Sequence, residues 1–203
     1  MLVNNKPPRT MFALDLKEWT LKDPIVSQRG AKSCPLECRA SSVILSVGTP
    51  DCPVSSPFGA STYGNEEGMT RKTLELSLEA EHLPQWEAIT AWARSYTEHH
   101  SERLFKRKLG KEQVLENFKA PTKQTGDYKP LLRCKIQTAG ARSVRCWDTS
   151  GAQVPLPEDL RGVPMSVKIR LDKLWIMSKE FGLVAEITDI QLHDSPDAAM
   201  CPF

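Results

Sequence analysis

Strict alternation of apolar and polar residues in the last third of the chain constrains the fold more than any other feature. Over residues 163–171 every second side chain is apolar: Val163, Met165, Val167, Ile169 and Leu171. A period of two is the spacing of a strand with one buried and one solvated face. We therefore expect a half-buried antiparallel strand here, and the outer face of this strand carries Ser166, Lys168 and Arg170.

Three earlier segments, residues 42–47, 70–79 and 131–138, alternate in the same way. The side chains that this pattern assigns to the core are Val43, Leu45, Val47, Leu74, Leu76, Leu78, Leu132, Cys134 and Ile136. Less regular patterns predict strands over residues 11–21, 143–147 and 182–192. Residues 48–69 are rich in proline, glycine and serine, which predicts a flexible loop.

A helical segment, residues 84–118, interrupts the strands. Pro84 suits the first turn of a helix, and apolar residues such as Trp86, Ile89 and Ala93 follow at helical spacing within residues 85–108. A second, short helix is expected over residues 111–118. Three strands, a long helix and four closely spaced strands favour a mainly β (α+β) fold, an antiparallel barrel with an inserted long helix. The length of 203 residues fits a single domain spanning 1–203.

The alternation changes phase at Asp172 and Lys173, where Leu174 and Ile176 become the next apolar pair. A β-bulge at this point would place Lys173 and Trp175 on the same outer face as Lys168 and Arg170. Without the bulge, Trp175 would stay in phase with Leu171 and lie in the core.

Composition excludes several classes of protein. No apolar run approaches the roughly 18 residues of a membrane-spanning helix, so we expect no membrane contact. The six cysteines are too sparse for a fold held together by disulfides. Residues 1–20 also lack the apolar stretch of a signal peptide. The sparse cysteines and this missing stretch indicate a protein of the cytoplasm or nucleus that is not secreted.

Motifs for catalysis or cofactor binding are weak. The chain has no glycine-rich phosphate loop, nucleophile elbow or HExxH motif, and His99–His100 at a helix end is typical of a solvated pair. Cys34, Cys38 and Cys52 resemble half of a zinc knuckle without a second pair, which favours free thiols. We therefore expect no enzyme activity, no cofactor and no metal.

Charge is distributed unevenly, although the formal net charge is only +2. Residues 94–135 hold eleven Lys/Arg and five Asp/Glu, whereas residues 180–203 hold five acids and no Lys/Arg. Cations on successive outer strand faces, interleaved with aromatic rings, form the usual platform for single-stranded nucleic acid. The positions expected on this face are Arg133, Lys135, Arg145, Trp147, Lys168, Arg170, Lys173 and Trp175.

The order of these segments resembles the OB-fold single-stranded DNA-binding proteins of podovirus-type bacteriophages and related proteins proposed in large DNA viruses. The similar features are Tyr63–Glu67 before the strand TRKTLELSLE, the helix QWEAITAWARSYTEHHSERL, Asp127–Pro130 before LLRCKI, a turn with Asp148, Ser150 and Gly151, and the paired strands of residues 163–192.

The resemblance implies an OB barrel and sequence-independent binding of single-stranded DNA in replication, recombination or repair, without catalysis. It assigns the binding cleft to Lys129 and to the positions named above other than Lys173. It also implies contacts with replication proteins through an acidic tail that ends in an aromatic residue. Here residues 193–203 end in Phe203 but carry only Asp194 and Asp197.

Two other functions are compatible with the same patterns. An OB-type face also accepts single-stranded RNA. Alternatively, the barrel could be a scaffold for protein contacts, in which case nucleic acid would bind only at low salt. The oligomeric state and the role of residues 1–60 have no signal in the sequence.

Overall fold

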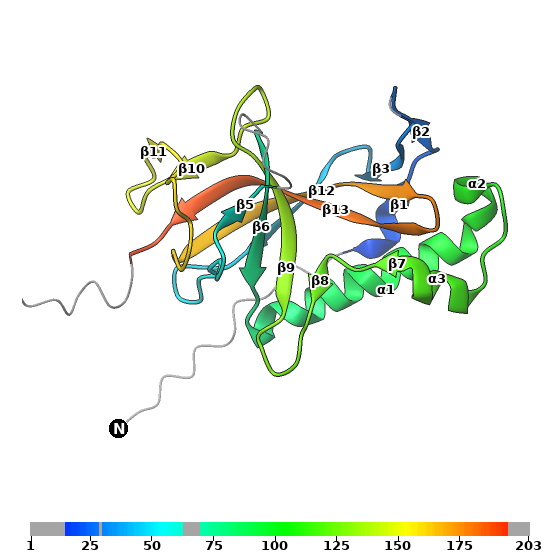
Figure 1. The fold of residues 1–203 in the computed structure, drawn as a ribbon, viewed down its shortest axis with the longest axis horizontal. Helices are drawn as coiled ribbons and strands as arrows, with labels where there is room; N and C mark the ends of the chain where they lie inside the picture. Colours follow the sequence, from blue (N-terminus) through cyan, green and yellow to red (C-terminus); the bar gives the residue numbers. More distant parts are fainter. Residues whose placement is uncertain (1–14, 29, 63–69, 195–203) are drawn as a thin grey trace, which may run out of the picture.

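Two long strands form the centre of the protein. The computed structural model describes residues 15–28, 30–62 and 70–194, in which β12 (Met165–Met177) and β13 (Glu180–Leu192) pair as an antiparallel hairpin (Figure 1). Met165, Val167, Ile169 and Leu171 of β12 are at most 2% exposed. The predicted inward face is confirmed from Met165 to Leu171, whereas Val163 precedes the strand and is half-buried.

The predicted bulge is present. Leu171 pairs with Ala185 and Lys173 with Val184, so Asp172 has no partner residue in β13. The pleat changes phase there, and Leu174 becomes the next fully buried side chain.

The first 60 residues supply strands to one edge of β12. β4 (Val43–Val47) pairs with residues 167–171 of β12, and β3 (Lys32–Cys38) pairs with residues 173–176. β1 (Trp19–Leu21) and β2 (Ile25–Val26) then pair with β3. Within β4 the buried side chains are Val43, Leu45 and Val47, as the alternation predicts.

Of the strand predicted over residues 11–21, only the last three residues, Trp19–Leu21 (β1), form a strand in the described part. Residues 11–14 lie outside the described residues, and a short 3₁₀ helix, η1 (Leu16–Glu18), precedes β1. The Asp15 carboxylate accepts a hydrogen bond from the Lys17 backbone N–H at 3.3 Å, which stabilises this turn over an extended strand.

The other edge of the hairpin makes parallel pairs, which corrects the expectation of an antiparallel barrel. β13 pairs in parallel with β7 (Phe118–Lys119), β9 (Leu131–Gln137) and β10 (Arg145–Trp147). Parallel strands need a crossover connection between them. The helical segment before β7 and the connection between β9 and β10 serve this purpose, so β7, β9 and β10 all run in the same direction as β13. The remaining pairs are antiparallel: β6 (Arg71–Ser77) and β8 (Thr122–Lys123) with β9, β5 (Ala60–Ser61) with β6, and β11 (Gln153–Val154) with β10.

The curled sheet closes into a ring through a short stretch of the loop after β4. Val54 bridges Met165 of β12, and Ser55 bridges Ser77 of β6, so the path β12–β13–β9–β6 returns to β12. Gly48 begins this loop with φ +79°, and a Cβ there would lie 2.8 Å from the Met165 carbonyl oxygen. Of the predicted flexible loop 48–69, residues 48–62 therefore make specific sheet contacts, and residues 63–69 lie outside the described residues.

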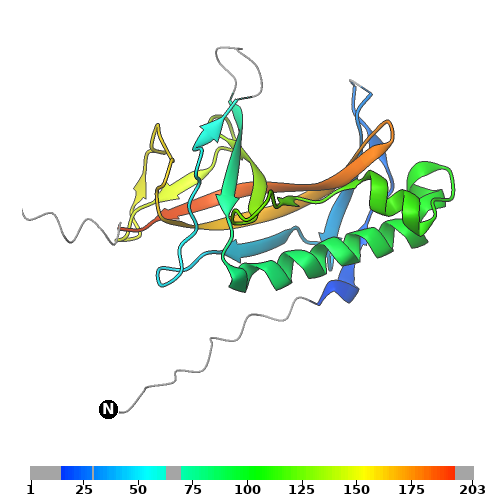
Figure 2. The same ribbon diagram turned by 60° about the horizontal axis from the view of Figure 1, so that its bottom comes forward.

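A helix lies along one side of the sheet (Figures 1 and 2). The turn η2 (Ala80–His82) leads into α1 (Leu83–His99), whose Trp86, Ile89 and Ala93 are buried against the core. The expected single helix over residues 85–108 instead ends at His99. α2 (Ser101–Phe105) follows, and the next residue, Lys106, caps it with φ +60°. α3 (Lys111–Asn117) completes the segment.

The Ser101 hydroxyl explains the break in this helix. It donates to the Glu98 carbonyl at 2.9 Å and accepts from the Leu109 backbone N–H at 3.1 Å, which holds the chain as it turns back. His99 and His100 are both exposed, as predicted. None of the helices in the described ranges is long and apolar enough to cross a membrane.

Candidate nucleic-acid interface

An open groove crosses the outer face of four neighbouring strands. Two adjoining hollows of about 560 and 460 Å³ share the residues Ser46, Arg145, Lys168 and Asp189. We call the combined hollow the outer groove. Toward one end it reaches Trp147, Pro50 and Gln191, and toward the other Arg142, Ile44 and Arg170.

The register of the strands brings the four shared residues into one row. Lys168 of β12 pairs with Ser46 of β4 on one side and with Asp189 of β13 on the other, and Asp189 pairs with Arg145 of β10. Residues paired across a sheet project to the same face. The row therefore joins segments that are more than a hundred residues apart in the sequence.

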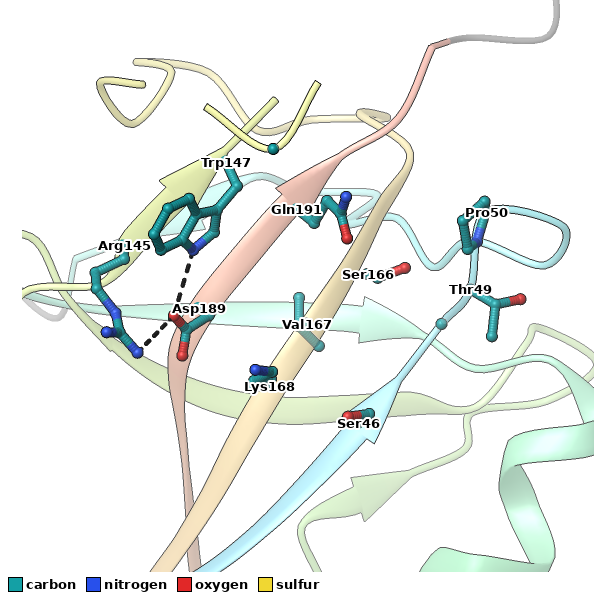
Figure 3. Close-up of a pocket in the computed structure, with 12 residues that line it drawn as sticks. Ser46, Thr49, Pro50, Arg145, Trp147, Ser166, Val167, Lys168, Asp189 and Gln191 are labelled. Atoms are coloured by element: carbon teal, nitrogen blue, oxygen red, sulfur yellow. Dashed lines mark hydrogen bonds and ion pairs between the residues drawn. The ribbon is translucent and has the colours of Figure 1, made fainter. Parts of the chain in front are cut away.

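Asp189 organises the aromatic end of the outer groove (Figure 3). Its Oδ1 lies 2.7 Å from Arg145 Nη2 and accepts a hydrogen bond from Trp147 Nε1 at 3.3 Å, and its Oδ2 accepts from the Thr188 hydroxyl at 2.9 Å. The Arg145 guanidinium carbon lies 6.0 Å from the centre of the Trp147 ring. One buried carboxylate thus orients both a cation and a ring, while the Arg145 side chain stays 57% exposed.

These contacts make Asp189 a source of pH-dependent stability. Burial raises the pKa of Asp189, but hydrogen bonds from Arg145, Thr188 and Trp147 and the charge of Arg145 outweigh burial, so the net pKa lies below its ordinary value. A lowered folded-state pKa stabilises the fold above the unfolded-state value of about 4 and loses this effect as the pH falls through the folded-state pKa.

We expect Asp189→Asn to lower the free energy of unfolding at pH 7, with a difference from wild type that shrinks below about pH 4. Urea unfolding at pH 7, 5 and 3 measures this difference. The exposed Asp194, at the end of β13, provides the matched control Asp194→Asn, which should change stability little at any of these pH values. A difference for Asp189→Asn that stays constant from pH 7 to 3 would contradict the assigned role.

The cations of the outer groove differ in how freely they face solvent. Lys168 is exposed and makes no ion pair within the described residues. In contrast, the Arg170 side chain is only 20% exposed, with Nη2 2.8 Å from the Glu186 carboxylate. Lys168 and Arg145 are thus available to a ligand, whereas Arg170 is held in a mostly buried ion pair.

The other predicted site residues do not line the outer groove. Lys129 lies 2.6 Å from Glu79, Arg133 lies 4.0 Å from Glu75, and Lys135 donates to the Thr73 hydroxyl at 2.9 Å. Lys173 lies 3.4 Å from Asp172, beyond the bulge. Four of the nine predicted residues, Arg145, Trp147, Lys168 and Arg170, are therefore brought together, and a role in binding for the others stays a prediction.

Trp175 follows the bulge as predicted but is only partly exposed. It pairs with Gly182 of β13, and its Nε1 lies 3.1 Å from the point where a Cβ at Gly182 would stand. The missing side chain of Gly182 leaves room for the indole to lie across β13. Trp175 is thus packed on the sheet near the C-terminal end of β12. Trp147 of β10 lies near the opposite end of β12, because its partner Gln191 pairs with Ser166.

The structure also changes the interpretation of the acidic end of the chain, residues 180–203. Glu186 and Asp189 lie on the central strand β13, beside Arg170 and Arg145, so charges separated in the sequence are mixed in space. Sequence reasoning missed Asp189, Ser46 and Ile44, because the pairings that place them in the outer groove are long-range. Residues 195–203, including most of the predicted acidic tail, and Tyr63–Glu67 lie outside the described residues.

The three cysteines of the suspected half-knuckle do not come together. Cys34 is fully buried in β3, and Cys38 ends that strand. Cys52 instead lies with Glu81 and His82, the group of metal-ligating side chains found in the described part of the chain.

Comparisons with known proteins find similarity in structure alone. No family model matches the chain, and no curated protein matches its sequence. Bacteriophage Enc34 single-stranded DNA-binding protein, in complex with ssDNA and as a C-terminal truncation, aligns at 12% identity with TM-scores of 0.44 and 0.45, over 87% of this chain and 93% and 92% of those chains. Gp2.5, a single-stranded DNA-binding protein encoded by bacteriophage T7, aligns at 12% identity with a TM-score of 0.50, over 79% of this chain and 96% of that chain. The described chain therefore shares the fold of bacteriophage T7 gp2.5.

Proposed function

We propose that this protein binds single-stranded DNA without sequence preference, on an OB-type barrel, and acts in replication, recombination or repair without catalysis. The observation that carries this proposal is the outer groove, in which Lys168 and Arg145 flank the partly exposed ring of Trp147. The shared fold with T7 gp2.5, a protein named for single-stranded DNA binding, supports it.

The groove offers the two contacts that a flexible single strand requires. Ammonium and guanidinium groups neutralise successive phosphates, and an indole stacks on any base because every base has a π face. The two hollows adjoin across β4, β12, β13 and β10, so a strand can pass from Trp147 past Lys168 toward Arg142. The exposed Ile44, 58% accessible, adds an apolar surface near the Arg142 end.

Fluorescence anisotropy of a labelled oligo-dT of about 30 nucleotides, long enough for several OB-type sites, tests the proposal. We expect tight binding to this oligonucleotide, much weaker binding to the same-length duplex, and a steep loss of affinity with salt. A matched oligo-U distinguishes RNA from DNA as the ligand. Absence of binding at moderate salt would refute the proposal and favour a protein scaffold.

Lys168→Gln should weaken binding uniformly across sequences and make the slope of log affinity against log salt shallower by about 0.7, the effect of one lost phosphate contact on a single strand. Lys179→Gln is the matched control, because Lys179 is also exposed but lies in the turn that joins β12 to β13, away from the outer groove. Equal effects of the two substitutions would mean that binding reflects net charge and not the outer groove.

A further inference from the structure

Three side chains capable of binding a metal converge where the loop after β4 meets the start of the helical segment. Cys52 belongs to this loop, and Glu81 and His82 belong to η2. One potential ligand atom from each residue lies within 4.8 Å of the others. Cys52 is half-buried, His82 is 8% exposed and Glu81 faces solvent. The group is thus open to an ion on the Glu81 side and closed behind His82.

The His82 imidazole has conflicting neighbours. Its Nε2 lies 3.3 Å from the Gly48 backbone N–H, a donor, and 3.6 Å from the Glu81 carboxylate, an acceptor. If Nε2 is unprotonated it suits Gly48 and repels Glu81, and if it carries a proton the reverse holds. Nδ1 is buried and has no hydrogen-bond partner among the described residues. Neither tautomer of the ring satisfies all of these groups.

We propose that Cys52, Glu81 and His82 bind a zinc ion, with a fourth position open to water. A thiolate sulfur, an imidazole nitrogen and a carboxylate oxygen are the ligand types of zinc, whereas magnesium and calcium prefer oxygen alone. A cation between Nε2 and the Glu81 carboxylate takes over the lone pair that accepts the 3.3 Å hydrogen bond from the Gly48 N–H, and it replaces the unfavourable contact of lone pair and carboxylate with two bonds. Glu79, adjacent in sequence to η2, is a second carboxylate near the site and is itself paired with Lys129 at 2.6 Å.

Zinc binds the thiolate form of cysteine, so it must displace the thiol proton of Cys52. Zinc affinity should therefore rise with pH.

The site would join two segments that matter for the outer groove. Gly48, Thr49 and Pro50, at the start of the same loop, line the groove, and the Thr49 hydroxyl accepts a hydrogen bond from the Cys52 N–H at 3.1 Å. Bound zinc would fasten this loop to the turn that begins α1. Tetrahedral zinc brings its ligand atoms to about 3.3–3.8 Å from one another, so side-chain movements of about 1 Å complete the site.

Titration of the reduced, chelator-treated full-length protein with zinc, in competition with a chromophoric chelator, tests the inference. We expect one zinc ion per chain and, with cobalt in its place, a thiolate-to-cobalt charge-transfer band. Cys52→Ser should abolish this band and lower zinc affinity by more than about 100-fold, since even outer contacts of a metal site contribute 10–100-fold. Zinc should also raise the Tm of wild type but not that of Cys52→Ser.

Cys38→Ser is the matched control, because Cys38 is also a half-buried free thiol and lies outside the cluster. Cys201→Ser controls for the cysteine outside the described residues. Glu81→Gln provides a second test at an exposed position, where misfolding is not a concern, and should also weaken zinc binding. The inference is overturned if wild type binds no stoichiometric zinc, or if Cys52→Ser and Glu81→Gln bind it as tightly as Cys38→Ser. Both results are independent of whether the protein binds DNA.

Discussion

Replacement of Arg170 by alanine is expected to destabilise the protein by about 3–5 kcal/mol, the usual cost of leaving one member of a buried ion pair alone. The Arg170 side chain is only 20% exposed, and its partner Glu186 is 7% exposed. Their shortest contact is 2.8 Å, and the Arg170 Nε lies 3.9 Å from Asp172 at the bulge. Alanine would leave the Glu186 carboxylate buried without its cation.

Urea unfolding followed by fluorescence measures this loss. In the double variant Arg170→Met with Glu186→Leu both charges are removed and apolar volume is kept, so much of the stability should return. A loss below 1 kcal/mol for Arg170→Ala would place the pair among ordinary surface salt bridges. Because the sequence pattern marks Arg170 as a DNA contact, its effect on binding should be measured only under conditions in which the variant is folded.

Trp147→Ala is expected to weaken binding of single-stranded DNA by about 1–3 kcal/mol, or roughly 5- to 150-fold, which is the contribution of one stacked base. Trp147 lines the outer groove, and its Nε1–H bond to Asp189 holds the ring in one orientation. The ring is therefore preorganised for stacking, and little ordering cost is left for binding. Anisotropy with oligo-dT gives the affinity, and thermal unfolding verifies that the variant is folded.

Two controls separate stacking from packing. Trp147→Phe keeps an aromatic face but loses the hydrogen bond to Asp189, so it should retain most of the affinity. Trp175→Ala removes a partly exposed tryptophan at the other end of β12, outside the outer groove, and should change affinity less than Trp147→Ala. If Trp175→Ala weakens binding more, the DNA path follows the outer face past the bulge, as the sequence pattern predicts, and the groove is not its centre.

Local patterns in the sequence were sufficient to predict most strands and the faces that they bury. Alternation identified Val167 and Ile169 as core residues, and the phase change at Asp172 identified the bulge, because side-chain direction along a strand depends only on neighbouring residues. The sequence pattern did not predict the break after His99. This break depends on two hydrogen bonds of the Ser101 hydroxyl, which donates to the Glu98 carbonyl and accepts from the Leu109 N–H.

Electrostatic partners could not be predicted in the same way. Alternation predicts that the cations Arg145, Lys168 and Arg170 all point outward. In the structure Arg145 forms an ion pair with Asp189 and Arg170 forms one with Glu186, whereas Lys168 makes no ion pair in the described ranges. These differences follow from which strand lies beside which, and in which register. A two-residue change of register would exchange the partners while leaving the buried face of each strand unchanged.

The sequence by itself determined that the chain is a strand-rich domain with one long helix, and which faces of the central strands are buried. Only the tertiary structure decided that β13 runs parallel to β9 and β10, that Ser46, Lys168, Asp189 and Arg145 form a single row, and that Cys52 meets Glu81 and His82. The physical reason is the separation along the sequence of the residues that make each kind of contact. Periodicity records the environment of each element separately, whereas a binding groove or a metal site depends on contacts between elements far apart in the chain.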